Sequence, residues 1–185
     1  AVTQEFLFEP PAATDDGHQT SLLDPPWEEE GGGGRGAQNH YPLMPLDQII
    51  LTICRCPLWR PAKNAHGWIW VTDNFLEDGM FLMRALGFTY KRTFVWVKPS
   101  IGLGYYGRGQ HELLLFGVRG KLPPLCARPS VINGPKREHS RKPDESYALI
   151  EATSPGPRLE IFSRQPRQGW TVWGNDPAVQ PTEPA

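Results

Sequence analysis

A chain of 185 residues with 39% hydrophobic side chains can bury one sizeable core, and its net charge of −1 excludes a uniformly basic or acidic protein. No apolar run is long enough to cross a bilayer and no secretory pattern opens the chain, so we expect a cytoplasmic protein without membrane segments. Cys54, Cys56 and Cys126 are odd in number and lack metal-ligand spacing, which indicates reduced core thiols and no metal centre.

The predicted elements alternate between strands and helices along the chain. Hydrophobic periodicity predicts strands at residues 20–23, 67–72, 88–97, 111–118, 158–162 and 169–173, and helices at residues 45–53, 73–86 and 143–152. The second of these helices carries Glu77 early and Arg84 late, with Gly87 just beyond, as the helix dipole and a C-cap favour. Such alternation predicts an α/β fold with a mostly parallel sheet and helices on both faces.

One domain is predicted at residues 19–176. Residues 1–18 are acidic and Pro-rich and residues 177–185 are also Pro-rich, so both are expected to be peripheral extensions. Residues 30–39 and 99–110 are rich in glycine and predict two loops that flank the entry to an active site.

The tetrapeptide Asp24-Pro25-Pro26-Trp27 follows the first predicted strand, at a point where open α/β sheets bind ligands. Two prolines fix a stiff turn without N–H groups, so the turn directs carbonyls outward. The Asp24 carboxylate and the Pro25 carbonyl can each accept one hydrogen from an exocyclic amine, which directs the nitrogen lone pair toward an electrophile. Trp27 can stack on a base. The competing interpretation is a Pro-rich turn with a buried tryptophan.

Further motifs occur in one order after this turn: Asn39-His40-Tyr41-Pro42, Lys142-Pro143-Asp144-Glu145, Leu159-Glu160-Ile161-Phe162-Ser163-Arg164, Gly169-Trp170 and Trp173-Gly174-Asn175. Together with the tetrapeptide, over about residues 20–176, they resemble the DPPW family of adenine-N6 methyltransferases. That family includes the catalytic subunit of the eukaryotic mRNA N6-methyladenosine writer and many bacterial and phage DNA enzymes. The resemblance implies a Rossmann-like domain that uses S-adenosylmethionine, with a permuted order that puts the catalytic turn before the cofactor-binding strand.

The resemblance also implies roles for individual residues. It assigns catalysis to the tetrapeptide Asp24-Pro25-Pro26-Trp27. It assigns cofactor binding to Asp24, Lys142, Phe162, Arg164, Asn175 and Asp176, the last of which replaces the Gln or Glu frequent in the family. Lys142 and Arg164 supply cations for a carboxylate, and the planar Arg164 fork also suits ribose hydroxyls.

Substrate contacts are expected from a basic central segment. Residues 84–142 contain twelve Lys and Arg side chains against Glu112 and Glu138, which suits phosphate contact, although a solvated charged surface is the competing interpretation. We assign substrate binding to His40, Tyr41, Lys98, Arg108 and Arg141.

The nucleic-acid substrate is left partly open by the sequence. We expect DNA ahead of RNA, and low sequence specificity because residues 119–135 offer few side chains to read base edges. A homodimer and a second subunit both remain open.

Two other classes of function compete with a methyltransferase. A catalytically silent nucleic-acid-binding partner subunit is the first alternative, but such proteins usually lose the catalytic tetrapeptide, which is intact here. An NAD-linked oxidoreductase is suggested by Gly102-Leu103-Gly104-Tyr105-Tyr106-Gly107, yet a strand rather than a helix is predicted after it and residues 121–128 contain no acid.

Overall fold

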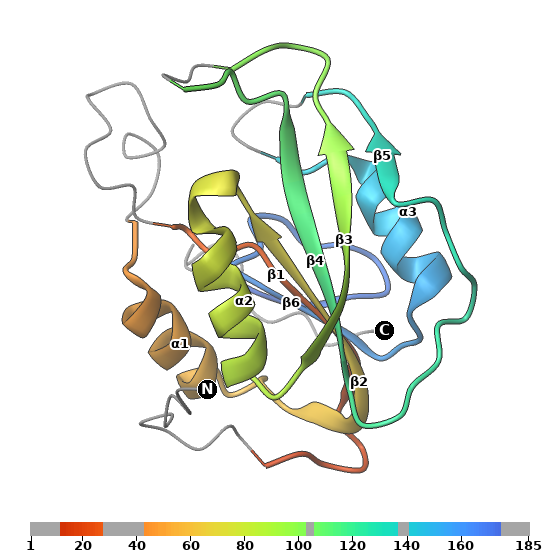
Figure 1. Cartoon of the computed structure of the whole chain (residues 1–185). Helices are drawn as coiled ribbons and strands as arrows, with labels where there is room; N and C mark the ends of the chain where they lie inside the picture. Colours follow the sequence, from red (N-terminus) through yellow and green to blue (C-terminus); the bar gives the residue numbers. More distant parts are fainter. Residues whose placement is uncertain (1–11, 28–42, 103–105, 137–140, 175–185) are drawn as a thin grey trace, which may run out of the picture.

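A seven-stranded sheet forms the centre of the molecule (Figure 1), shown by a computed structural model that describes residues 12–27, 43–102, 106–136 and 141–174. The strands are β1 His18–Leu23, β2 Pro61–Val71, β3 Thr89–Val97, β4 His111–Arg119, β5 Val131–Asn133, β6 Arg158–Ile161 and β7 Thr171–Trp173. They lie in the order β5-β3-β4-β2-β1-β6-β7, so the first strand of the chain lies inside the sheet, between β2 and β6. The ends of β1 and β6 therefore lie side by side.

The strand directions confirm the predicted mostly parallel sheet. β1 pairs in parallel with β2 and β6, β6 with β7, and β3 with β5. Among the described strands, only β4 runs the other way, antiparallel to β2 and β3. The beginning of β4 consequently lies at the same edge of the sheet as the ends of β1, β2 and β3.

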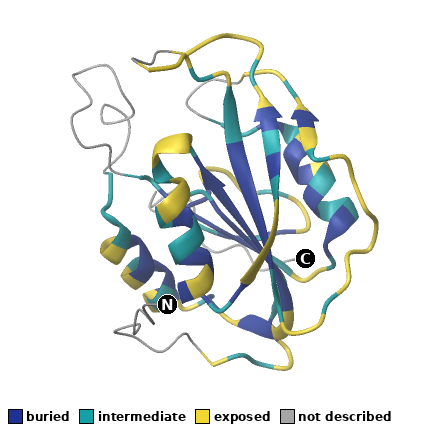
Figure 2. Cartoon of the chain, viewed as in Figure 1, coloured by how far each residue is buried: buried dark blue, intermediate teal, exposed yellow. Residues whose placement is uncertain are grey.

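Helices cover both faces of this sheet, as predicted. α1 Leu46–Arg55 and α2 Leu76–Ala85 lie on one face, where Ile49, Ile53 and Leu82 are fully buried in a core with residues of β1, β2 and β6. α3 Asp144–Thr153 lies on the other face and buries Ile150 in a second, aromatic-rich core. Strands β1, β2, β4 and β6 are consequently mostly buried between the helices, whereas the first half of β3 is exposed (Figure 2).

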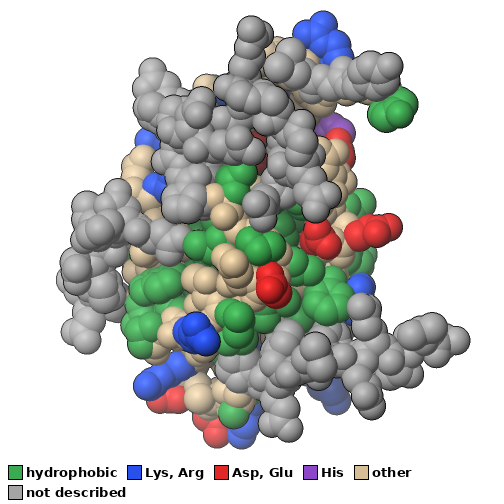
Figure 3. All heavy atoms as spheres, turned by 90° about the vertical axis from the view of Figure 1, so that its left-hand side faces the viewer, with side chains coloured by type: hydrophobic (Ala, Val, Ile, Leu, Met, Phe, Trp, Pro, Cys, Tyr) green, Lys and Arg blue, Asp and Glu red, His purple; other side chains and the backbone are tan. Residues whose placement is uncertain are grey.

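The face that carries α1 and α2 is hydrophobic in patches and has few charged side chains at its centre (Figure 3). Leu51 of α1 is 47% exposed and Leu76 of α2 is 38% exposed.

Several elements differ from the sequence predictions. β2 begins at Pro61, earlier than predicted, and β5 was not predicted because it has only three residues, of which only the middle one is buried. The predicted helix at residues 73–86 opens with a 3-10 turn, Asp73–Phe75, before α2. Cys126 is exposed, so the prediction that all three thiols are core residues is wrong for this one. No helix among the described residues is long and apolar enough to cross a membrane.

Thr14, within the predicted N-terminal extension, pairs with Ala62 beside β2. The boundaries of the predicted domain at residues 19–176 stay predictions.

Candidate active site

The turn that contains the tetrapeptide leaves the sheet between two parallel strands. Asp24 follows β1 directly, and its backbone N–H points to the carbonyl of Ile161 at the end of β6, 3.5 Å away. The backbone N–H of Trp27 donates to the Pro25 carbonyl at 3.0 Å, and the backbone N–H of Met44 donates to the Pro26 carbonyl at 2.8 Å. These bonds fix the turn. The Pro25 carbonyl keeps a second lone pair for another donor.

Trp27 is anchored on one side. Its indole N–H donates to the Trp70 carbonyl at 3.0 Å, and its ring stacks on Phe75 with 5.5 Å between centroids and 14° between planes. The side chain also packs against the core beneath α1 and α2. A nucleobase can therefore stack only on the indole face opposite Phe75.

A chain of four charged groups runs from Asp24 across the edge of the sheet. The Lys142 ammonium lies 3.0 Å from Asp24 Oδ1 and 3.0 Å from Glu112 Oε2, while Lys98 Nζ lies 2.6 Å from Glu112 Oε1. Only 10% of the Lys142 side chain and 13% of the Glu112 side chain are exposed. We call Asp24, Lys142, Glu112 and Lys98 the charge chain.

The protonation states of the charge chain follow from burial and from neighbouring charges. Burial lowers the pKa of Lys142, but the carboxylates of Asp24 and Glu112 outweigh burial and raise this pKa above its ordinary value. For Glu112 the effects have the opposite signs. Burial raises its pKa, but the ammonium groups of Lys142 and Lys98 outweigh burial and lower this pKa below its ordinary value. Lys142 and Glu112 are therefore both charged at neutral pH.

A cleft of about 860 Å³ opens beside Asp24 at the carboxyl ends of β1 and β6. Five of the predicted site residues line it: Asp24, Arg141, Lys142, Phe162 and Arg164. They come from three segments far apart in the sequence, which meet because β6 pairs with β1 and α3 follows Lys142. The structure thus brings the predicted catalytic acid and the predicted cofactor-binding side chains together.

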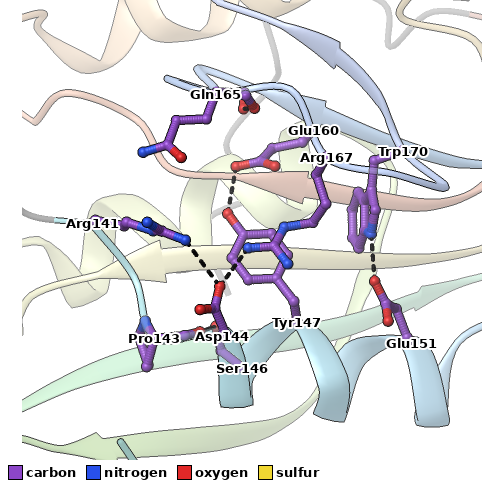
Figure 4. Close-up of polar contacts among 11 residues, drawn as sticks. Arg141, Pro143, Asp144, Ser146, Tyr147, Glu151, Glu160, Gln165, Arg167 and Trp170 are labelled. Atoms are coloured by element: carbon purple, nitrogen blue, oxygen red, sulfur yellow. Dashed lines mark hydrogen bonds and ion pairs between the residues drawn. The ribbon is translucent and has the colours of Figure 1, made fainter. Parts of the chain in front are cut away.

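A second polar network lies in the wall of this cleft (Figure 4). Asp144 Oδ1 accepts hydrogen bonds from Arg141 at 3.3 Å and from Arg167 at 2.7 Å. The Arg167 guanidinium lies 3.6 Å from the ring centroid of Tyr147, and the Tyr147 hydroxyl donates to Glu160 at 2.8 Å. The network holds the start of α3 against the segment that follows β6.

Glu160 is a buried acid of β6 that lines the cleft, with 5% of its surface exposed. Burial raises its pKa, the Tyr147 hydrogen bond opposes this rise, and the charge of Asp24 adds to it, giving a pKa of about 7. Among the described residues, Glu160 has hydrogen-bond partners but no ion-pair partner. It therefore changes charge near neutral pH.

Phe162 directly follows β6 and has a backbone φ of 68°, in the left-handed region that residues other than glycine rarely adopt. Such strain concentrates at ligand sites and is held in place by surrounding structure. The conformation turns the chain from the buried strand into the cleft wall at Ser163 and Arg164.

The other predicted site residues lie elsewhere. Lys98 belongs to the charge chain and not to the cleft lining, and Arg108 is exposed, with Nε donating to the Gly102 carbonyl at 3.1 Å. His40, Tyr41, Asn175 and Asp176 lie outside the described residues. Their assigned roles stay predictions.

The sequence interpretation missed four residues of this site: Glu112, Tyr147, Glu160 and Arg167. One signal was available for Glu160, because a charged residue inside a buried strand pattern is unusual and indicates a paired or functional group. Asp144 stood in a motif that carried the resemblance, but it had no assigned role.

The residues of the cleft match the chemistry of S-adenosylmethionine. The cofactor carries a sulfonium, an ammonium, a carboxylate and ribose hydroxyls, and the cleft presents the carboxyl groups of Asp24 and Glu160 together with the basic side chains of Arg141, Lys142 and Arg164. Its volume lies within the roughly 300–1,000 Å³ usual for small-molecule sites. No group of three or more His, Cys, Asp or Glu side chains in the described part of the chain is arranged to hold a metal ion.

Comparison with known proteins agrees with this geometry. Residues 18–176 match the MT-A70 family. An MT-A70-like N(6)-adenosine-methyltransferase of Medicago truncatula is 34% identical over 171 residues, covering 83% of this chain and 25% of that protein. The N(6)-adenosine-methyltransferase subunit METTL3 of Danio rerio is 33% identical over 168 residues, covering 83% of this chain and 27% of that protein.

A more distant relative is the N(6)-adenine-specific methyltransferase METTL4 of Mus musculus, 22% identical over 179 residues, covering 84% of this chain and 36% of that protein. The chain thus spans about a quarter to a third of the length of these curated relatives. Methyltransferases of the MT-A70 family use S-adenosylmethionine as methyl donor. The match over most of its length shows that this chain belongs to the MT-A70 family of methyltransferases.

Proposed function

We propose that the protein transfers a methyl group from S-adenosylmethionine to the N6 amine of adenine in nucleic acid. The observation that carries this proposal is the position of Asp24, which ends the central strand β1 and opens onto a cofactor-sized cleft. When bound there, S-adenosylmethionine supplies an electrophilic methyl group on a sulfonium.

The chain's own residues would prepare the amine for attack. The Asp24 carboxylate and the Pro25 carbonyl each accept one hydrogen of the exocyclic amine, which withdraws the nitrogen lone pair from the ring. Positive charge would develop on the nitrogen as it bonds to the methyl group and the methyl–sulfur bond breaks, so the fixed carboxylate stabilises the transition state more than the ground state. The sulfonium would leave as a neutral thioether, and the amine would release one proton to solvent. The face of Trp27 opposite Phe75 stacks on the base. Lys142 contacts Asp24 Oδ1 and offsets its charge.

The substrate we propose first is adenosine in RNA. The names of most of the relatives specify adenosine, the ribonucleoside, so they support RNA over the DNA expected from the sequence. DNA is the second candidate, because the METTL4 name specifies adenine without a sugar. Low sequence specificity, a cytoplasmic location and assembly as a homodimer or with a second subunit are further proposals.

Methyl transfer onto matched substrates tests this function. The protein is incubated with isotope-labelled S-adenosylmethionine and single-stranded RNA, duplex RNA, single-stranded DNA or duplex DNA of the same sequence, and the nucleosides are identified by mass spectrometry. We expect N6-methyladenosine, with more product from single strands because they avoid the cost of base extrusion. Methylation confined to deoxyadenosine would select DNA, and methylation at another atom would contradict the proposal.

A calorimetric measurement of S-adenosylmethionine binding separates the enzyme from a silent partner subunit. An enzyme binds the cofactor and transfers the methyl group. Nucleic-acid binding without either property would favour the silent subunit, which the intact Asp24–Lys142 pair argues against.

A further inference from the structure

Basic side chains gather at the edge of the sheet opposite the active site, where α2 and β4 end and β3 begins (Figure 1). They come from the last turn of α2, from the exposed first half of β3, and from the end of β4 with the turn that follows it. We call this group the distal basic surface: Arg84, Lys91, Arg92, Arg119 and Lys121.

Strand pairing and helix packing bring these elements together. Tyr90 of β3 pairs with Gly117 of β4, two residues before Arg119. The end of α2 reaches the same place, because a Cβ at Gly87, three residues after Arg84, would lie 3.4 Å from the guanidinium carbon of Arg119. The three elements therefore present their cations close to one another.

An irregularity in the ladder between β3 and β4 adds a basic residue to this edge. Lys91 lies between the paired positions Tyr90 and Arg92 and has no partner of its own in β4. A bulge of this kind redirects side chains away from the regular alternation of a strand. Since β5 pairs with β3 only at residues 95–97, no described strand covers the outer side of β3 near Lys91.

Most cations of the distal basic surface are not neutralised by the protein. In the part of the chain that the structure describes, no acid forms an ion pair with four exposed members: Arg84, Lys91, Arg92 and Lys121. By contrast, Lys63 of β2 lies 2.9 Å from an aspartate oxygen. Neighbouring like charges raise the local positive potential, which favours an anion supplied from outside the chain.

An exposed aromatic ring lies among these cations. Tyr90 is 36% exposed, and its hydroxyl forms a 2.9 Å hydrogen bond with the hydroxyl of Thr93, which holds the ring along β3. Cations beside an exposed ring suit a single-stranded nucleic acid, because the cations contact phosphates while a base stacks on the ring. A duplex keeps its bases stacked inside and offers Tyr90 no such face.

We propose that the distal basic surface binds the backbone of the single-stranded RNA whose adenine is methylated at the opposite edge of the sheet. This inference rests on the proposed function, from which the ligand is taken. From Glu112 at the active edge to Arg119, β4 rises through seven steps of about 3.3 Å, or roughly 23 Å. At roughly 3.4 Å per nucleotide of a stacked strand, about seven nucleotides cover that distance. The surface therefore contributes only to substrates longer than this span.

Protection of the open edge of β3 is the competing role for the same charges. Charged side chains on an edge strand prevent it from pairing with the edge of another chain. With only that role, removal of the charges would increase self-association and leave the affinity for RNA unchanged. Sedimentation and RNA binding therefore separate the two roles.

Two matched double variants test the proposal. Arg84→Gln/Lys91→Gln removes two charges from the distal basic surface, and the control Arg55→Gln/Arg128→Gln removes two charges elsewhere. Arg55 matches Arg84 because both are exposed in the last turn of a helix, and Arg128 is an exposed cation like Lys91. If the test variant does not fold, Lys91→Gln/Arg92→Gln replaces it, since both of its changes lie in the exposed start of β3.

The probe is a single-stranded RNA of about 30 nucleotides, several times the required span, whose Kd is measured by fluorescence anisotropy over a range of salt concentrations. Each phosphate contact of a single strand contributes about 0.7 to the slope of log affinity against log salt concentration, so the test variant should lose roughly 1.4 of this slope. Its affinity should fall roughly ten- to thirtyfold near about 0.1 M salt, whereas the control should keep the wild-type slope.

Substrate length shows whether the effect arises away from the active site. An RNA of about four nucleotides is too short to reach both edges, so wild type and test variant should methylate it at the same rate. With the long RNA at saturation, kcat of the test variant should equal that of wild type, because the active edge is unchanged.

Equal slopes for the test and control variants would overturn the inference, as would an equal loss of activity on the short RNA. Greater self-association with an unchanged slope would also overturn it and assign the charges to protection of the edge. The binding measurement does not require catalysis. Absence of methyl transfer by the wild-type chain would therefore overturn the proposed function, whereas methyl transfer with equal slopes would overturn the inference alone.

Discussion

At the scale of single residues, the proposed chemistry depends most on Asp24, because it faces both substrate and cofactor while Lys142 offsets its charge. We expect Asp24→Asn to lower kcat on the order of a hundredfold or more, since the amide cannot stabilise the positive charge that develops on the amine. The fold should survive, because Lys142 keeps Glu112 as its anion. Single-turnover rates and calorimetric cofactor binding measure this split, and Asp47→Asn on the exposed side of α1 is the control. Near-normal turnover by Asp24→Asn would reject the assignment.

Glu160 makes the stability of the protein depend on pH. Its pKa rises from 4.5 to about 7 on folding, so its contribution to stability is complete below pH 4.5 and is lost as the pH rises through 7. Glu160→Gln keeps an acceptor for Tyr147 without this titration. The variant should therefore gain stability over wild type at pH 8, by on the order of 3 kcal/mol at most, and little at pH 4.5.

Denaturant unfolding of both proteins between pH 4.5 and pH 8 measures this difference. The control is Glu77→Gln, at an exposed position of α2, which should leave the dependence of stability on pH as it is in wild type. A pH-independent difference between wild type and Glu160→Gln would show that folding does not raise the pKa of Glu160.

Residue patterns and the family resemblance predicted one half of the site and not the other. Asp24 and Arg164 follow predicted strands at the carboxyl edge of the sheet, whereas Lys142, just before a predicted helix, was assigned from the resemblance alone. Glu112 could not, since periodicity does not reveal that its strand is reversed. The Arg167 contact with Tyr147 depends on how the segment after β6 folds back onto α3, which no local pattern encodes.

At the scale of elements, α2 packs closely on β2 and β4 because glycines occupy two facing positions of these strands. Gly67 pairs with Gly117, and a Cβ at Gly67 would lie 2.9 Å from the Phe88 ring. A Cβ at Gly117 would lie 2.6 Å from the sulfur of Met83 on α2. Helix and sheet can therefore approach closely only while both positions lack side chains.

Gly67→Ala should consequently destabilise the protein by roughly 1–3 kcal/mol, the usual cost of overpacking a core. Thermal or chemical unfolding measures the loss. Gly109→Ala is the control, because a Cβ there meets nothing within 4 Å. Equal stability of the two variants would mean that Phe88 moves aside without cost.

The alternating pattern predicted most of these elements because long apolar strands and capped helices leave strong local signals. β5 left none, because its three residues gain their structure from pairing with Val95, Trp96 and Val97 of β3. The same holds for the start of β2, where Pro61 and Ala62 are buried by tertiary contacts that no local pattern shows.

At the scale of the whole molecule, the permuted order makes the sheet depend on its last strands. β6 supplies Leu159 and Ile161 to one core, and the segment after it supplies Trp170 and Val172 to the other. A chain that ends at residue 157 lacks both strands and exposes one edge of β1. We expect this truncated chain to show no cooperative unfolding transition, whereas a chain that ends at residue 176 should retain one. Calorimetry distinguishes the two, and a cooperative transition in the shorter chain would show that β1 to β5 fold alone.

The central place of β1 also has a consequence for biosynthesis. Thr20 is among the first residues of the sheet to leave the ribosome, yet its partner Arg158 is among the last. At about 5–20 residues per second, the apolar strand waits on the order of ten seconds with one edge open. During that interval it is a target for chaperones and for aggregation, so the rate of translation should influence the yield of active protein.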